Sequence, residues 1–328
     1  MKRILKILAI SLAILIVIVV LFGLFLNRGL KYAPQPAQFE CLDISDGAFI
    51  TYDTFPKHIY GIGLAYAGHI NETAADFDPK TDPPIFRKAI GSLLINGGDI
   101  RTPDRNEMFG ALEKLEPGIS KTLERISDFP ALLDYEVELG VILLDDINAE
   151  ALLNEDFVPN LGFFIANDLG ARSVAILGEG QINRYDYWGI SKSFYGFTAI
   201  DGRIWIPGQH YSNGLPCIDI ETRVNGEIRQ KQSTADLIYT PRQMLRAIHR
   251  KYPDTPLKKG DLVLTGTPGG VAMSAPRWLV RLASIIGMDR WDKLAHKTSE
   301  EDIAKFLKAG DEVITSAEGL GSVKVVIR

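Results

Sequence analysis

Residues 134–144 read DYEVELGVILL, and this segment sets the expectations for both fold and chemistry. Successive side chains of a β-strand point to opposite faces, so Asp134, Glu136 and Glu138 share one face of a strand whose other face is apolar. Carboxylates this close repel each other unless protons or a cation intervene. Oxygen ligands suit Mg²⁺, Mn²⁺ or Ca²⁺ better than zinc. The segment therefore predicts a strand with a divalent-metal site, or alternatively the solvated acidic face of an edge strand.

Other segments carry polar residues suited to a catalytic site. Asp168 follows the apolar run GFFIAN, which places it at a strand end, unless it caps a turn or helix. His69 and Glu72 are neighbours on one helical turn, so the carboxylate can orient the imidazole as a general base, although such a pairing also arises by chance. Lys192, in SKSF, is by itself typical of a surface lysine. Thr267 lies in the turn GTPGG, which either holds an anion with its backbone N–H groups or only closes the chain.

Residues 7–26, ILAISLAILIVIVVLFGLFL, form an apolar run of twenty residues without a charge. A helix of this length spans roughly 30 Å, the hydrocarbon thickness of a bilayer. The run is longer than the core of a cleaved signal peptide, so it predicts an uncleaved, single-pass membrane anchor with the lipid bilayer as a partner. Three basic residues precede the run and two follow it, which favours a catalytic body outside the cytoplasm.

The composition excludes several classes of protein. The chain has 328 residues, with 41 acidic against 36 basic side chains and a formal charge of −5. This balance, without a long basic tract, argues against a nucleic-acid partner. Two cysteines are too few for a disulfide scaffold or a Cys-rich zinc module. Cys41 and Cys217 either pair with each other or are ordinary core thiols, and the pattern favours the thiols.

The rest of the chain alternates short apolar runs with turn residues. The expected strands are 136–144, 218–223, 227–232, 261–265 and 323–327, and the expected helices are 106–115, 241–252 and, in pieces, 276–307. The pair Asn225-Gly226 is typical of a type I′ hairpin. Thr298 and Glu301 fit a capping box. Because strands and helices do not alternate regularly, we expect a β-rich α+β fold rather than a doubly wound sheet.

Taken together, these segments resemble the fumarylacetoacetate hydrolase family in its short form, without the separate SH3-like domain. The matching motifs occur in family order and cover most of residues 57–328: GIGLAYAGHINET, PPIFRKAIGSLL, DYEVELGVIL, GFFIANDLGARS, SKSFYGF, VNGEIRQ, GDLVLTGTPGGV, FLKAGDEV and GLGSVKV. The resemblance implies a mixed β-sandwich roll. The expected domains are the anchor at residues 1–31, a linker and entry strand at 32–56, and the catalytic domain at 57–328.

The resemblance also implies roles for individual residues. Glu136, Glu138 and Asp168 match the residues that bind a divalent metal, Mg²⁺ or else Mn²⁺ or Ca²⁺. Lys192 matches the lysine that helps to stabilise a developing enolate. Two further residues, His69 and Glu72, match a dyad on a mobile lid, here about residues 64–105.

On the substrate side, Arg172 and Thr267 match residues that contact the substrate, and Lys88 matches a lysine with a weaker assignment. The implied chemistry begins with a small 2-oxo acid or 1,3-diketone that chelates the metal, which acts as a Lewis acid. His69 then activates the water that cleaves a C–C bond. Family members commonly form homodimers.

The sequence departs from the family pattern beside Arg172 and near the C-terminus. Ser173 and Ala175 stand where the family usually has Asp and Gln, and residues 272–306 form an unusually long connection that contains an amphipathic helix. The leading hypothesis is a membrane-anchored hydrolase of acylpyruvate-like substrates. The alternatives are a decarboxylase, isomerase, hydratase or lyase with the same site, or a tethered binding protein without activity.

Overall fold

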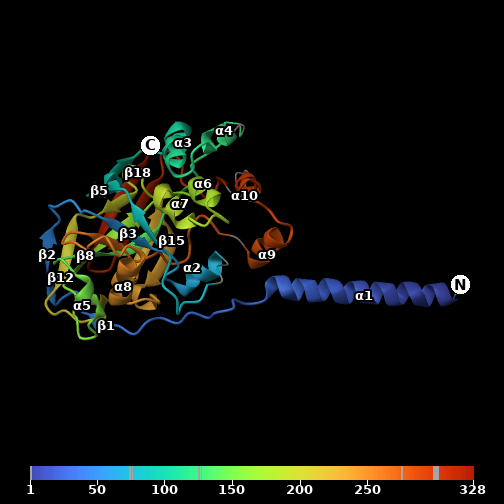
Figure 1. Cartoon of the computed structure of the whole chain (residues 1–328), viewed down its shortest axis with the longest axis horizontal. Coiled ribbons are helices and arrows are strands. Elements are labelled where there is room, and N and C mark those ends of the chain that lie inside the picture. Colours follow the sequence, from blue (N-terminus) through green and yellow to red (C-terminus); the bar gives the residue numbers. More distant parts are fainter. Residues whose placement is uncertain are drawn as a thin grey trace.

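The computed structural model describes residues 2–73, 75, 77–124, 126, 128–274, 276–297 and 303–328. A β-rich body holds most of the chain, and the helix α1 (Lys2–Asn27) projects away from it (Figure 1). Within α1, the segment Ile10–Asn27 has a mean hydropathy of 2.9 and is largely exposed, so it is long and apolar enough to cross a membrane. The capping box expected at Thr298 and Glu301 lies outside the described residues.

A large mixed sheet forms the centre of the body. Its strands run in the order β2 (Gly47–Thr51), β12 (Arg203–Pro207), β9 (Leu161–Asp168), β8 (Val137–Leu143), β16 (Leu262–Leu264), β3 (Ile59–Ile62) and β4 (Ile85–Lys88). Two more strands, β11 (Thr198–Ile200) and β5 (Leu93–Ile95), extend it from β9. The strand β8, which carries Glu138 and follows Glu136, is therefore central and buried along its length, which excludes the alternative of a solvated edge strand.

A second sheet packs against the first. Its order is β15 (Glu227–Ser233), β14 (Asp219–Val224), β17 (Glu312–Ala317), β18 (Gly321–Ile327) and β6 (Gly98–Ile100). The apolar alternation of β8 explains the packing, because Val137 and Leu139 are fully buried in the same core as Ile220 of β14. The hairpin at Asn225-Gly226 is confirmed: both residues have positive φ, at 51° and 85°, as a type I′ turn requires.

Short pairs and helices complete the body. The parallel pair is β1 (Glu40–Leu42) with β13 (Gly214–Pro216), and the antiparallel pair is β7 (Leu133–Asp134) with β10 (Gly170–Ala171). The body helices are α2 (Ala67–Glu72), α3 (Arg105–Leu115), α4 (Ile119–Leu123), α5 (Ala149–Leu153), α6 (Arg172–Leu177), α7 (Arg184–Ser191), α8 (Pro241–Lys251), α9 (Arg277–Ile285) and α10 (Arg290–Lys297). The long connection thus contains two helices, α9 and α10. Within the expected lid, β4, β5 and β6 belong to the sheets, whereas α2 is a separate short helix.

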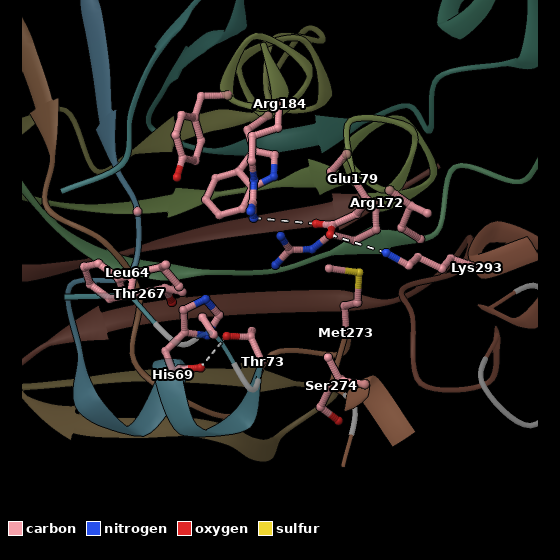
Figure 2. A pocket seen from close by; sticks show the side chains of 18 of the residues that line it. Leu64, His69, Thr73, Arg172, Glu179, Arg184, Thr267, Met273, Ser274 and Lys293 are labelled. Carbon is pink, nitrogen blue, oxygen red and sulfur yellow. Dashed lines mark hydrogen bonds and ion pairs between the residues drawn. The ribbon is translucent and has the colours of Figure 1, made fainter. Parts of the chain in front are cut away.

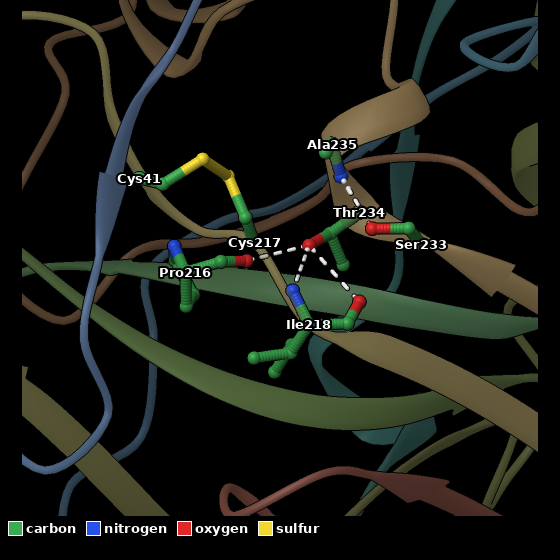
Figure 3. Close-up of a disulfide and its surroundings, with 7 residues drawn as sticks. All are labelled: Cys41, Pro216, Cys217, Ile218, Ser233, Thr234 and Ala235. Carbon is green, nitrogen blue, oxygen red and sulfur yellow. Dashed lines mark hydrogen bonds between the residues drawn. A yellow bond between two sulfur atoms is a disulfide. The ribbon is translucent and has the colours of Figure 1, made fainter.

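The preference for two free thiols is wrong. Cys41 and Cys217 form a disulfide, with their Cα atoms 5.2 Å apart (Figure 3). They meet because β1 pairs in parallel with β13, which sets Cys41 opposite Leu215, close to Cys217. The segment after Cys217 is held by the Thr234 hydroxyl, which accepts a hydrogen bond from Ile218 N at 2.9 Å. The bond therefore fastens the linker between α1 and the body, and no local sequence signal marks this long-range contact.

Candidate active site and metal centre

The pairing of β8 with β9 gathers the three candidate metal ligands. The two strands are antiparallel, with Glu138 opposite Ala166, and Asp168 N donates to Glu136 O at 2.8 Å. Asp168 is the last residue of β9, as its position after an apolar run predicts. Glu136, Glu138 and Asp168 are buried, and one ligand oxygen from each lies within 4.8 Å of the others. An all-carboxylate set of this size fits a hard divalent cation such as Mg²⁺, Mn²⁺ or Ca²⁺.

The electrostatics of the two glutamates differ. Burial opposes ionisation of Glu136, but the charges of Lys192 and Arg172 outweigh it and lower the pKa of Glu136 to about 2. Burial and the neighbouring Asp168 raise the pKa of Glu138 well above its ordinary value. Its Oε2 atom accepts a hydrogen bond from Gly266 N at 2.7 Å. The negative charge of Glu136 is thus balanced by neighbouring cations, whereas that of Glu138, beside Asp168, is not.

Lys192 lies among the metal-ligand candidates. It follows α7, and its Nζ is 2.7 Å from Glu136 Oε2 and 2.6 Å from Asp168 Oδ2. Burial alone would lower the pKa of Lys192, but Asp168 and Glu136 outweigh that effect and raise it. The ammonium group is therefore charged, and Lys192 lines the same cavity as Glu136 and Glu138. This environment differs from the surface position that the isolated sequence pattern suggests.

Lys88 and Arg172, both expected on the substrate side, pair with carboxylates. Lys88 is buried at the end of β4. Its Nζ donates one hydrogen bond to Asp168 Oδ1 and another to Phe197 O at 2.9 Å. Burial lowers the pKa of Lys88, although Asp168 opposes this shift. Arg172 donates to Asp134 Oδ2 at 2.8 Å and bonds to Glu136, and it lines the cavity.

Asp134 does not join the metal cluster, although its alternation with Glu136 and Glu138 suggests a shared face. Besides Arg172, it accepts hydrogen bonds from the backbone of Tyr135, Ala272 and Met273. Asp134 therefore ties the strand to the start of the long connection and positions Arg172.

The Gly-Thr-Pro turn closes over Glu138. Thr267 donates to Val137 O at 3.1 Å and accepts from Gln230 Nε2 at 2.9 Å, and it lines the cavity. Gly266 has φ +96°, and a Cβ there would lie 2.7 Å from the Cβ of Ala65, so the turn needs glycine. Gln230, the last residue of the motif VNGEIRQ, thus holds the turn in place, a role that the sequence analysis did not assign.

His69 and Glu72 lie together on α2, as their spacing predicts. His69 Nδ1 is 3.8 Å from Glu72 Oε2, which also accepts a hydrogen bond from Gly270 N at 2.9 Å. Within the part of the chain that the structure describes, His69 Nδ1 is buried without a hydrogen-bond partner. A small rotation would bring it to Glu72, and such looseness is common in unliganded catalytic pairs.

One cavity of about 710 Å³ joins these groups. His69, Glu136, Glu138, Arg172, Lys192 and Thr267 all line it. Figure 2 shows Arg184, Glu179 and Lys293 along another part of its wall, with His69 on α2 and Met273 and Ser274 beyond them. Arg184 and Lys293 were also missed from the sequence, because their place depends on how α7 and α10 pack. The cavity has the size of a small-molecule site.

The comparisons with known proteins point to one family. The family model described as "Fumarylacetoacetate (FAA) hydrolase C-terminal" matches residues 58–328. Among curated relatives, a mitochondrial oxaloacetate decarboxylase of Dictyostelium discoideum is 26% identical over 237 residues, which cover 71% of this chain and 90% of that protein. An oxaloacetate tautomerase of Bacillus subtilis is 26% identical over 226 residues, covering 68% and 63%.

Solved structures share the fold. A fumarylpyruvate hydrolase from Pseudomonas aeruginosa, in complex with Mn²⁺ and pyruvate, aligns with a TM-score of 0.52 at 19% identity, covering 91% of this chain and 97% of that one. A 5-carboxymethyl-2-hydroxymuconate delta-isomerase from Mycobacterium smegmatis aligns with a TM-score of 0.51 at 20% identity, covering 85% and 81%. The expected α+β fold is thus confirmed. These four similar proteins are enzymes of several kinds, and three of them are named for oxo acids.

Proposed function

This chain belongs to the fumarylacetoacetate hydrolase family, and we propose that it is a metal-dependent hydrolase that cleaves a C–C bond in acylpyruvate-like 2-oxo acids or 1,3-diketones. The observation that carries the proposal is that His69, which lies beside Glu72, lines the same cavity as Glu136 and Glu138 of the carboxylate cluster. A water base beside a cation site is what hydrolysis requires and simple decarboxylation does not.

Glu136, Glu138 and Asp168 would hold the divalent cation, which when bound supplies Lewis-acid polarisation of the substrate's paired oxygens. The chain's own groups do the rest. His69 takes a proton from water through the ring nitrogen that does not face Glu72, and the hydroxide attacks the distal carbonyl carbon. The C–C bond breaks, and its electron pair leaves with the pyruvate fragment. Lys192 donates a hydrogen bond or a proton to that fragment.

The His69→Ala variant tests the proposal against a second candidate, an oxaloacetate decarboxylase, which the Dictyostelium relative favours. A positioned general base contributes typically ~10²–10⁴-fold, so His69→Ala should slow acylpyruvate hydrolysis by about that factor. Glu72→Gln should cost less, since the imidazole remains. Loss of CO₂ from oxaloacetate should survive better in both variants. Hydrolysis at the parent rate in His69→Ala would rule out the proposed role of the pair.

We also propose that α1 anchors the protein in a membrane with the body outside the cytoplasm. Two observations support this: the exposed apolar segment of α1, and the Cys41–Cys217 disulfide, since such bonds persist in oxidising compartments. In membranes from cells, a maleimide-polymer reagent should label the two cysteines only after reduction. Labelling without reductant would contradict the proposed location. The homodimer stays a prediction.

A further inference from the structure

The cavity is larger and more apolar than a small oxo acid needs. Beyond the carboxylates the cavity continues along α9 and the loop that follows it. Leu279, Val280 and Ala283 of α9 and Met288 of the loop line this part. Leu279, Val280 and Ala283 lie on one stretch of α9. Covering apolar protein surface with an apolar group removes both from water, which lowers the free energy. These side chains therefore form an apolar wall in the same cavity as Glu136 and Glu138, which together with Asp168 make up the acid cluster.

The charged groups near this wall include one carboxylate that lies between two cations. Glu179 lies 3.6 Å from Arg184 and 3.8 Å from Lys293. A second carboxylate on the substrate would have to lose its hydration against the apolar wall, a cost that an apolar group avoids. Ala175, which stands where a longer polar side chain is usual in the resembled family, also lines the cavity. The wall thus favours an uncharged, apolar extension of the substrate.

The same helix is fastened to the root of α1. Arg281 of α9 donates to backbone carbonyls at the end of α1, namely Phe25 at 3.0 Å and Leu26 at 3.1 Å, and to Arg28 at 2.7 Å. Figure 1 shows α9 beside the inner end of α1. On its outer side, α9 exposes Trp278 and Ile285. If α1 spans a bilayer, the apolar end of the cavity lies on the membrane side of the body.

We propose that the substrate is an amphiphile: an oxo acid whose polar end reaches the acid cluster and whose alkyl or acyl chain lies along Leu279, Val280 and Ala283. This deepens the proposed function and rests on it for the polar end. It predicts that affinity rises with chain length until the cavity is filled. Each buried methylene should tighten binding by up to about fourfold.

Binding provides the test, because it does not require turnover. The full chain in nanodiscs, loaded with Mn²⁺, is titrated with 2-oxo acids from 2-oxobutanoate to 2-oxodecanoate, with free ligand measured by dialysis. Dissociation constants should fall steadily along the series. A dicarboxylic 2-oxo acid of matched length should bind more weakly than its alkyl counterpart. A flat series, or tighter binding of the dicarboxylic acid, would overturn the inference.

Two variants of α9 test where the alkyl chain of the ligand binds. Leu279→Asn places an amide on the wall, whereas Ile285→Asn makes the same change at an exposed position of the same helix that does not line the cavity. The measured quantity is the ratio of long- to short-chain affinity within each variant. Leu279→Asn should reduce this ratio at least tenfold, and Ile285→Asn should keep the parent ratio. Equal ratios in both variants would contradict the placement of the chain.

The outcomes separate this inference from the proposed function. If acylpyruvates are not hydrolysed but the chain-length series is steep, the hydrolase proposal fails and the amphiphile inference stands. If acylpyruvates are hydrolysed equally well at every chain length and the binding series is flat, the hydrolase proposal stands and the inference fails. Ala283→Phe adds an independent check, because the larger side chain occupies part of the cavity. In this variant, affinity should stop rising at a shorter chain length than in the parent.

Discussion

Replacing Lys192 by methionine should tighten metal binding while it abolishes activity. The Lys192 Nζ donates to Glu136 Oε2 at 2.7 Å and to Asp168 Oδ2 at 2.6 Å, so it occupies two of the three carboxylates that would bind the cation. A hydrogen bond to a charged group is worth about 1.5–3 kcal/mol. A cation that binds here must replace one such hydrogen bond. Removing the Lys192 ammonium group should therefore lower the dissociation constant for the cation roughly 10- to 100-fold.

The assay is calorimetric titration of the metal-free full chain with Mn²⁺, at fixed pH and ionic strength. Lys192→Arg is the matched control, because it keeps the positive charge and should bind Mn²⁺ within about threefold of the parent. Hydrolysis of an acylpyruvate should be lost in Lys192→Met, since methionine cannot donate to the departing fragment. Unchanged or weaker Mn²⁺ binding in Lys192→Met would refute the reasoning that the ammonium competes with the cation.

Three other perturbations have defined outcomes. Glu136→Gln, Glu138→Gln and Asp168→Asn should each weaken Mn²⁺-dependent thermal stabilisation, and unchanged Mn²⁺ affinity in all three would remove the basis of the metal site. Reduction of Cys41–Cys217, which are separated by 176 residues, should lower the free energy of unfolding by up to about 5 kcal/mol in denaturant titrations; an equal midpoint with and without reductant would contradict this. Because the pKa of Glu136 is depressed to about 2 from 4.5, its contribution to stability is present above pH 4.5 and should be lost as pH falls towards 2; Glu136→Gln should flatten this part of the stability profile, and an identical profile in the variant would argue against it.

The sequence predicts those features that depend on local patterns. The alternation of residues 134–144 identifies a strand with an apolar face, and Val137 and Leu139 are indeed buried in the core. The Asn225-Gly226 pair identifies a hairpin, because only a few residue types tolerate two positive φ values in succession. Asp168 lies at a strand end because an acid after an apolar run marks the end of a buried strand. Each of these rests on backbone geometry within a few residues.

What the sequence could not predict depends on long-range pairing. The disulfide requires β1 to pair with β13, and nothing near Cys41 specifies that partner. Arg172 matches a substrate residue by resemblance, but only the fold shows that Asp134 and Glu136 bind its guanidinium. Likewise, the amphipathic pattern of α9 shows an apolar face without showing that part of that face lines the cavity.

The charge balance of the buried centre explains why a divalent cation fits there. Among the described residues, four carboxylates are buried together with three basic side chains: Asp134, Glu136, Glu138 and Asp168, with Lys88, Arg172 and Lys192. One negative charge is left over if all are ionised. The excess falls on Glu138, which within the described part of the chain has no ion pair and accepts from Gly266 N. Burial and the neighbouring Asp168 raise the pKa of Glu138, so a proton would take the place of the missing positive charge. A cation bound beside Glu138 would remove this cost, so the side-chain charges favour metal at the point where the carboxylates converge.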